Sequence, residues 1–208
     1  MQIETKLVSV EGPPWLEVAL AALRGGGLVA FPTDTVYGVG ALAFDGEAIR
    51  QIYRVKGRSA EKSIPILVRG QEDPGRVAAL FGPAQRLASA FWPGPLTLVV
   101  QRDAAVPQAI GPGDTVGVRA PDHQVALELL RSAGPLAASS ANRSGGKSAR
   151  TASEVVESLG GRIAVIIDGG VCPGGRPSTV VDCTGLEPVL LRDGPISLER
   201  IQAVWFRG

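Results

Sequence analysis

Short apolar runs alternate along the chain with amphipathic segments of helical period, and this alternation constrains the fold more than any other feature. The apolar runs are four to five residues long, which suits buried strands. They lie at 28–31, 64–68, 96–100, 115–119, 136–139, 163–167, 178–182 and 188–192. The amphipathic segments predict helices at 14–24, 46–56, 83–91, 123–132, 152–159 and 197–206. Strands interleaved with helices are typical of an α/β domain with one central sheet and helices on its faces.

The connection between the runs 163–167 and 178–182 leaves no room for a helix. Parallel neighbours in a sheet need a longer crossover, so this pair predicts that part of the sheet is antiparallel. We therefore expect a twisted, mixed sheet of parallel and antiparallel strands. The chain has 208 residues, of which 45% are apolar, and this is enough for one domain with a full core. We expect a single domain over 1–208.

Composition argues against several classes of function. The 21 basic and 20 acidic residues leave the net charge near zero, whereas a non-specific nucleic-acid coat needs a basic excess, so anion binding must be local. The sequence has one histidine, His123, and two cysteines, Cys172 and Cys183, outside any C-x-x-C spacing. A histidine-based triad or a histidine–cysteine metal site is therefore not expected. We see no signal peptide and no apolar run of membrane-spanning length, and we expect a soluble, cytoplasmic protein.

Hydroxyl and cationic side chains follow the predicted strand ends, between glycines and prolines. The segment 30–40 reads AFPTDTVYGVG and puts Thr33 and Thr35 directly after a short apolar strand. The same order recurs at 56–62, 115–119, 139–142, 178–179 and 192. Each segment alone is also explained by a turn or a solvated surface. Together they predict a ligand pocket, because ligand sites in open sheets gather at strand ends.

Two of the chain's four lysines fall in the segment YRVKGRSAEKS, which contains Lys56, Arg58 and Lys62. Cations at the end of a helix complement its dipole, which is one explanation for them. The other is a polyphosphate clamp, in which lysine acts as a point charge and arginine as a fork. Neither a P-loop nor a G-x-G-x-x-G fingerprint occurs in the chain, so a nucleotide must bind by another geometry.

The segment 137–151, AASSANRSGGKSART, also has two interpretations. Ser140 and Asn142, followed by a glycine-rich basic loop, suit a phosphate or another polar ligand. A surface loop with local turn hydrogen bonds explains the same composition. Thr151 and Glu154 further match a capping box for the next helix.

Seven segments in order resemble the YrdC family, the threonylcarbamoyl-AMP synthases that act in making threonylcarbamoyladenosine in tRNA. They are PTDTVYGVG, KGR followed by EK, WPGPLTLV, TVGVRAPDH, SSANRSG, PSTVVD and LLRDG, and they span roughly residues 28 to 195. The resemblance implies a twisted mixed sheet with a large concave, positively charged cavity. It is to the short form of the family, without the extra C-terminal domain that longer relatives carry after a linker.

The resemblance implies a nucleotidyltransferase that condenses L-threonine, bicarbonate and ATP to threonylcarbamoyl-AMP, pyrophosphate and water. Magnesium accompanies the ATP as cofactor, and no metal site made of protein ligands is expected. The product goes to a downstream tRNA threonylcarbamoyl transferase machinery. Similar proteins also bind double-stranded RNA, so tRNA or double-stranded RNA is a further expected partner, and a membrane is not. Two alternatives stay open: a non-catalytic double-stranded RNA-binding module of the same fold, and a carbamoyl-transfer domain as in the longer hydrogenase-maturation proteins.

The matching motifs imply site roles for particular residues of this chain. Contacts with the threonine substrate are implied for Thr33, Thr35, Arg119, Ser140 and Ser178. Contacts with ATP are implied for Lys56, Arg58, Lys62, Thr115, Asn142, Thr151 and Arg192. Of these, Lys56 and Arg58 are expected to stabilise the charge that develops during catalysis. The chain departs from relatives that read K-x-R-P-x-x-[HN]-P-L, because it has Glu61 and Lys62 in that region.

Two further expectations concern the shape of the site. Carbamates hydrolyse readily, so the site should exclude water, and the loop 143–150, with its two glycines and Lys147, is the expected lid. The segment PTDTVYG is expected to form the floor of the threonine site. Tyr37 then serves as packing or as a wall, while Pro32 and the glycines hold the turn.

Overall fold

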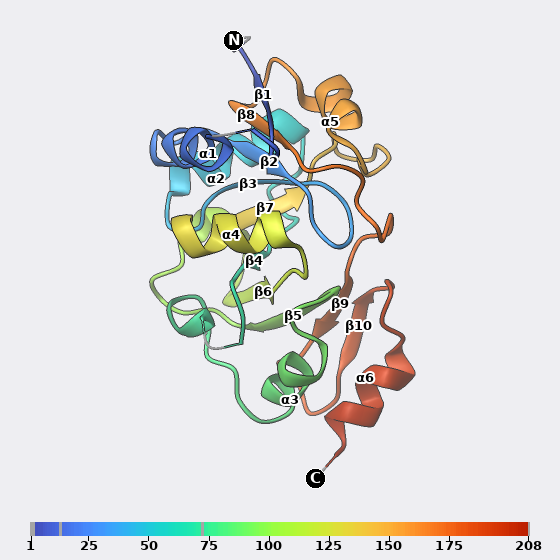
Figure 1. The fold of residues 1–208 in the computed structure, drawn as a ribbon. Coiled ribbons are helices and arrows are strands. Elements are labelled where there is room, and N and C mark those ends of the chain that lie inside the picture. Colours follow the sequence, from blue (N-terminus) through green and yellow to red (C-terminus); the bar gives the residue numbers. More distant parts are fainter. Residues whose placement is uncertain (1–2, 13, 72, 208) are drawn as a thin grey trace.

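One ten-stranded sheet runs through the protein, which a computed structural model describes at residues 3–12, 14–71 and 73–207 (Figure 1). Its strand order is β1-β8-β2-β3-β7-β4-β6-β5-β9-β10. The strands are β1 (Lys6–Ser9), β2 (Val29–Phe31), β3 (Gly38–Leu42), β4 (Ile66–Leu67), β5 (Leu96–Gln101), β6 (Thr115–Arg119), β7 (Leu136–Ser140), β8 (Val165–Asp168), β9 (Thr179–Asp182) and β10 (Val189–Arg192). The pairs β1–β8, β2–β8, β4–β6 and β5–β9 are parallel, and the other neighbours are antiparallel. The predicted mixed sheet is confirmed.

The runs 163–167 and 178–182 were expected to form an antiparallel pair, and this is wrong, because β8 and β9 are not neighbours in the sheet. β8 pairs with β1 and β2, whereas β9 pairs with β5 and β10. The segment 169–178 between them crosses the sheet instead of turning back as a hairpin. On its way it binds the loop 32–37, since the amide of Gly174 donates to the carbonyl of Asp34 at 3.1 Å. This crossing segment therefore covers the loop that was predicted to form the pocket floor.

The sheet carries helices on both faces, as the sequence predicted. The helices are α1 (Trp15–Arg24), α2 (Gly46–Lys56), α3 (Gly82–Phe91), α4 (Gln124–Ala133), α5 (Ala152–Leu159) and α6 (Leu198–Trp205), with short 3₁₀ helices η1 (Pro74–Arg76) and η2 (Gln108–Ile110). Each α-helix lies within one residue of its predicted bounds at both ends. None of the helices in the described part of the chain is long and apolar enough to cross a membrane.

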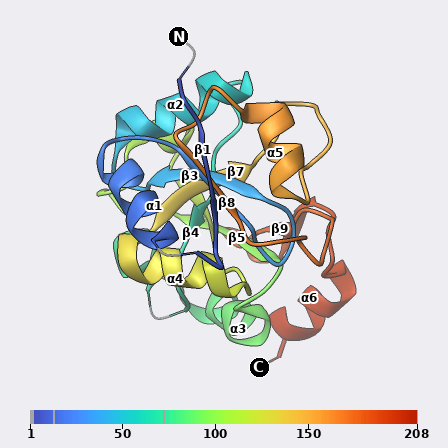
Figure 2. The same cartoon turned by 45° about the horizontal axis from the view of Figure 1, so that its top comes forward.

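Alternate strand residues pack into two separate cores, because successive side chains point to opposite faces of a sheet. Val29 and Phe31 of β2 pack with α1 and α4, whereas Ala30 between them belongs to the other core. That second core includes side chains of α2, α3, α5 and α6. Figures 1 and 2 show α1 and α4 lying together on one side, away from α5 and α6.

The sequence did not indicate β1 or β3. β1 is an exposed edge strand with polar ends, so its pattern does not alternate clearly. β3 reads GVGAL, and glycine and alanine are depleted in strands. Packing explains its second glycine: a Cβ on Gly40 would lie 3.0 Å from the carbonyl oxygen of Ala137 and 3.3 Å from the Phe31 ring. The close approach of β7 and this ring therefore accounts for a strand that propensity alone misses.

Candidate functional site

Two adjoining pockets open on the sheet where β3, β7, β4, β6, β5 and β9 meet. The inner pocket has a volume of about 120 Å³ and is lined by Thr33, Thr35, Val36, Tyr37, Gly38, Arg58, Pro65, Leu67, Thr97, Arg119, Ala138, Ser139, Ser140, Pro177, Ser178 and Arg192. The outer pocket has a volume of about 300 Å³ and is lined by Arg58, Ser63, Pro65, Thr97, Val99, Thr115, Gly117, Val180, Leu191 and Arg192. They share Arg58, Pro65, Thr97 and Arg192, so they adjoin each other as two parts of the candidate cavity.

Hydroxyls and arginines from strand ends meet in this cavity, as the sequence pattern predicted. Of the predicted site residues, the inner pocket brings together Thr33, Thr35, Arg58, Arg119, Ser140, Ser178 and Arg192, and the outer pocket adds Thr115. The described lining of these two pockets does not include Lys56, Lys62, Asn142 or Thr151.

The loop 32–37 is both a turn and a pocket wall. The hydroxyl of Thr33 donates to the carbonyl of Val36 at 2.7 Å and accepts from the amides of Thr35 and Val36 at 3.2 and 3.3 Å. The hydroxyl of Tyr37 donates to the carbonyl of Gly170 at 2.9 Å and so ties the loop to the crossing segment. These bonds fix the loop while the side chains of Thr33, Thr35 and Tyr37 still line the inner pocket.

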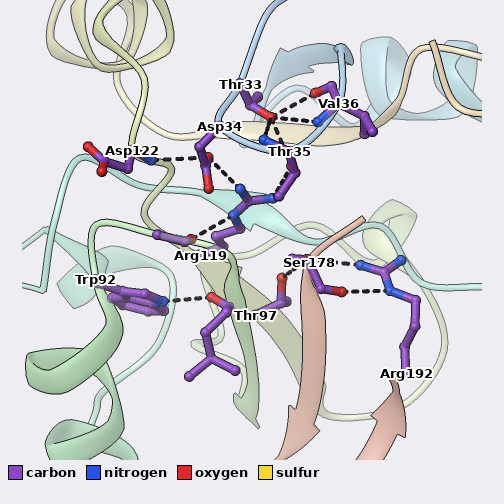
Figure 3. A network of polar contacts seen from close by, with 12 residues as sticks. Thr33, Asp34, Thr35, Val36, Trp92, Thr97, Arg119, Asp122, Ser178 and Arg192 are labelled. Atoms are coloured by element: carbon purple, nitrogen blue, oxygen red, sulfur yellow. Dashed lines mark hydrogen bonds and ion pairs between the residues drawn. The ribbon is translucent and has the colours of Figure 1, made fainter. Parts of the chain in front are cut away.

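Arg119 lies at the end of β6, is 6% exposed and is held on three sides (Figure 3). Its Nε donates to the carbonyl of Gly94 at 3.0 Å, and its Nη1 donates to the hydroxyl of Thr35 at 3.0 Å. Its Nη2 lies 2.5 Å from Oδ1 of Asp34. Burial lowers the pKa of Arg119, and the charge of Asp34 opposes that shift. We did not predict Asp34; a carboxylate between two threonines in the segment PTDT was the available signal.

Ser178 is held from both sides at the start of β9. Its hydroxyl lies 2.8 Å from that of Thr97, and Arg192 reaches it from β10 (Figure 3). The Nη2 and Nε of Arg192 donate to the hydroxyl and the carbonyl of Ser178, each at 2.9 Å. Burial, followed by the charges of Arg119 and Arg58, lowers the pKa of Arg192, which is the effect of cations gathered in one cavity. Thr97 was missed, and its signal was a single hydroxyl within the apolar run 96–100.

Arg58 lines both pockets from the turn that follows α2. Its Nε donates to the carbonyl of Lys62 and its Nη2 to the carbonyl of Ser63, both at 3.0 Å. Burial lowers the pKa of Arg58. The side chain of Lys62 is exposed, so this residue contributes its carbonyl to the orientation of Arg58. Direct contact of Lys62 with ATP stays a prediction.

Lys56 is 2% exposed and lies behind the wall of the cavity. Its Nζ donates to the carbonyls of Ser140 and Asn142, at the point where β7 ends. Burial, with a smaller contribution from the charge of Arg58, lowers the pKa of Lys56 to about 8. Lys56 thus fixes the backbone around Ser140, and its predicted contact with phosphate stays untested.

Asn142 fixes the next part of the same wall. Its Nδ2 donates to the carbonyls of Arg143 and Gly146, both at 2.7 Å, while its Oδ1 is buried and has no partner within the described residues. This anchors the base of the loop 143–150. The lid role of that loop and the contact of Asn142 with ATP stay predictions.

Thr151 caps α5, as its capping-box motif indicated. Its hydroxyl accepts from the amide of Glu154 at 3.2 Å, and a Glu154 carboxylate oxygen accepts from the amide of Thr151 at 3.3 Å. We expect Thr151→Ala to lower the free energy of unfolding by about 1 kcal/mol, because an N-cap hydroxyl is lost. Urea denaturation measures this loss, with Thr151→Ser as the control that keeps the cap. An unchanged stability would contradict the capping role, and a weakened ATP affinity would support the predicted contact.

Thiol chemistry at this site is disfavoured. Burial raises the pKa of the Cys172 thiol to about 11 and that of the Cys183 thiol to about 12, so both are protonated at neutral pH and are poor nucleophiles. Within the described part of the chain, no group of three or more histidine, cysteine, aspartate or glutamate side chains could hold a metal ion. The arrangement suits binding and charge stabilisation of anions rather than covalent catalysis.

The chain is similar in sequence to known proteins. The sequence profile of the Sua5_yciO_yrdC family, described as telomere recombination, matches residues 21–194. A threonylcarbamoyl-AMP synthase of Pyrococcus abyssi (strain GE5 / Orsay) is 46% identical over 192 residues, covering 91% of this chain and 56% of that protein. One of Bacillus subtilis (strain 168) is 43% identical over 198 residues, covering 92% of this chain and 56% of that protein.

The fold is also similar to that of a solved structure. The crystal structure of P. abyssi Sua5 complexed with L-threonine has a TM-score of 0.90 and 43% identity, and the match covers 97% of this chain and 61% of that chain. The chain therefore spans a little over half the length of the curated relatives named above.

Proposed function

Because the chain belongs to the Sua5_yciO_yrdC family, we propose that it is an L-threonylcarbamoyladenylate synthase. It forms threonylcarbamoyl-AMP and pyrophosphate from L-threonine, bicarbonate and ATP, for the threonylcarbamoyladenosine modification of tRNA. The observation that carries this proposal is the pair of joined pockets, one lined by hydroxyls around Arg119 and the other flanked by Arg58 and Arg192. Two ligands that must react with each other can occupy two such pockets at once.

L-threonine binds in the inner pocket. Its carboxylate pairs with Arg119, and Thr35 and Ser178 supply hydroxyls for its polar groups. Val36, Leu67 and Ala138 give this pocket an apolar part that suits the methyl group of threonine. The similarity to P. abyssi Sua5, which was crystallised with L-threonine, supports binding of this amino acid, and the lining of the inner pocket is the reason for placing it there.

ATP binds in the outer pocket. Arg58 and Arg192 lie where the pockets join, so they neutralise the phosphates next to the bound amino acid. Val99, Val180 and Leu191 form an apolar surface of the outer pocket on which a nucleoside can pack. Thr115 lines the same pocket and is available for a hydrogen bond.

The reaction requires alignment of two anions rather than a protein nucleophile. The amine of threonine adds to bicarbonate with loss of water, or to CO₂ with loss of a proton, to give a carbamate. A carbamate oxygen then attacks the α-phosphorus of ATP and displaces pyrophosphate. Positioning of the reactants contributes up to about 7–11 kcal/mol to such a step. Arg58, fixed by two carbonyls before the substrate arrives, stabilises the charge that develops on the phosphates.

Magnesium enters this proposal as an ion carried by ATP. Arginines and hydroxyls line the two pockets, and the described lining includes no carboxylate. These residues do not fit direct ligation of magnesium, which prefers oxygen ligands and binds readily to substrate phosphates.

We assign the protein to the cytoplasm and its product to a tRNA threonylcarbamoyl transferase.

Pyrophosphate release tests the proposal. We expect release from ATP only when L-threonine and bicarbonate are both present, and much less with serine or glycine. Pyrophosphate release at the same rate with and without L-threonine would contradict the proposed function. Salt-sensitive binding of double-stranded RNA by a folded protein that releases no pyrophosphate would favour the non-catalytic RNA-binding alternative.

Limited proteolysis tests the proposed lid. The loop 143–150 contains Gly145, Gly146 and Lys147, and the Lys147 side chain is 82% exposed. We expect trypsin to cut this loop more slowly when ATP and L-threonine are bound, because a closed lid protects its backbone. Equal cleavage rates with and without the ligands would contradict lid closure. Cleavage elsewhere on the surface serves as the internal control.

A further inference from the structure

We propose that Asp34 is a specificity-determining residue whose charge offsets that of Arg119, so that polyanions bind in the outer pocket and are kept out of the inner one. This inference deepens the proposed function and rests on it for the identity of the amino acid. The exclusion of polyanions from one of two joined pockets is testable without any turnover.

The three arginines that line the inner pocket differ in what they contact. Arg119 is paired with Asp34, at 2.5 Å, and the two side chains are only 8% and 12% exposed. Arg58 and Arg192 donate instead to uncharged carbonyl and hydroxyl oxygens. The net positive charge of the cavity is therefore concentrated at Arg58 and Arg192, which both pockets share.

Among the described neighbours of Asp34, Arg119 is the one whose charge balances that of the Asp34 carboxylate. Its Oδ1 also accepts from the amide of Asp122 at 3.1 Å, and its Oδ2 is buried with no partner within the described residues. Burial lowers the pKa of His123 and raises that of the Cys172 thiol to about 11, so burial favours the uncharged form of both neighbours. Asp122 is itself exposed to solvent. The Asp34–Arg119 pair thus sets the charge at this end of the inner pocket.

A pair with zero net charge discriminates between the two kinds of ligand. A zwitterionic amino acid carries a carboxylate and an ammonium group, and it can bind beside Arg119 without an excess of negative charge. A pyrophosphate or triphosphate group would bring several negative charges close to Asp34 in a poorly solvated site. Like charges held together in such a site repel each other strongly, so a polyanion prefers the outer pocket.

Competition in the wild-type protein is the first test. L-threonine is titrated by calorimetry with and without saturating inorganic pyrophosphate. We expect both to bind at once, with the Kd of threonine changed less than about threefold. Displacement of threonine by pyrophosphate would overturn the proposal. If threonine does not bind at all, the proposed function fails. Titration of pyrophosphate into the wild type and the Asp34→Asn variant then still tests whether the charge of Asp34 weakens pyrophosphate binding.

Asp34→Asn is the second test, because it keeps the shape and the acceptor oxygen but removes the charge. We expect pyrophosphate to enter the inner pocket at least about tenfold more tightly and to compete with threonine. Pyrophosphate should also raise the Tm of this variant more than that of the wild type, since a bound anion replaces the missing partner of Arg119. A structural role alone would not produce this gain of anion binding.

Two controls make the result specific to this pair. Glu47→Gln removes one charge from the exposed Glu47–Arg50 pair, which has the same 2.5 Å separation, and it should bind pyrophosphate as the wild type does. Asp34→Asn combined with Arg119→Gln removes both charges and should lose the gained binding. Pyrophosphate binding by Asp34→Asn that equals the wild type, with no competition, would overturn the proposal. If that variant does not fold, the wild-type competition decides alone.

Discussion

Arg58→Ala is expected to lower kcat/KM for pyrophosphate release at least about 100-fold while the protein stays folded. Arg58 lines both pockets and is oriented by the carbonyls of Lys62 and Ser63, so its charge is aimed before any substrate binds. Loss of such a preorganised cation removes stabilisation that develops in the transition state. Loss of an ordinary surface arginine would change the rate very little. Initial rates at varied ATP and threonine concentrations measure the effect.

Arg54→Ala is the matched control for this prediction. Arg54 lies on the last turn of α2, the helix that precedes Arg58. It is exposed and lines neither of the two pockets. Its removal should leave the rate within about twofold of the wild type. Arg58→Lys should be intermediate, because it keeps the charge but loses the planar fork. A soluble, folded Arg58→Ala variant with full activity would contradict the role assigned to Arg58.

Lys56→Met is expected to lower the free energy of unfolding by about 2–4 kcal/mol. The substitution keeps the length of the side chain but leaves the carbonyls of Ser140 and Asn142 without their buried donor. An unsatisfied buried group costs about 1–3 kcal/mol, and two carbonyls are affected. Urea denaturation measures the loss. Lys147→Met, at a lysine that is 82% exposed, should change stability by less than about 0.5 kcal/mol.

The effect of Lys56→Met should also depend on pH. The pKa of Lys56 is about 8 in the folded protein and 10.5 in its ordinary state, so between these values the folded chain binds fewer protons than the unfolded one. Raising the pH through this window therefore stabilises the wild type relative to the variant, by at most about 3 kcal/mol. Tyr37, Cys172 and Cys183 titrate in both proteins, so they cancel in the difference. Parallel stability curves from pH 7.5 to 10 would contradict the buried, weakly basic lysine.

Local patterns were sufficient to predict most elements of the fold, whereas the order of the strands was not readable from them. The helix over 46–56 was predictable because Asp45 accepts from the amide of Ala48 and Gly57 adopts the left-handed conformation that ends it. The place of β8 between β1 and β2 depends on a segment that crosses the sheet, and no short-range signal encodes that crossing. The segment leaves no room for a helix, which suggested an antiparallel pair of β8 and β9, and this was misleading.

The candidate site was predictable where a residue's own chemistry determines its place. Arginines and hydroxyls at strand ends, such as Arg119 and Ser178, do line the cavity. Lys56 shows the limit of this reasoning, because its partners are backbone carbonyls 84 and 86 residues away. Asp34 was overlooked for a similar reason: its importance comes from Arg119, 85 residues later in the chain. A sequence shows which residues are charged, but it does not show which group each of them pairs with in the folded protein.

Direct detection of the product tests the central claim most sharply. The protein is incubated with ATP, magnesium, L-threonine and ¹³C-labelled bicarbonate, and the mixture is analysed at once by mass spectrometry. We predict threonylcarbamoyl-AMP that carries the label, in an amount equal to the pyrophosphate released, and a rate of formation at least about 100-fold lower with Arg58→Ala protein. Active, folded protein that releases pyrophosphate without forming a labelled adduct of threonine and AMP would contradict the proposed function.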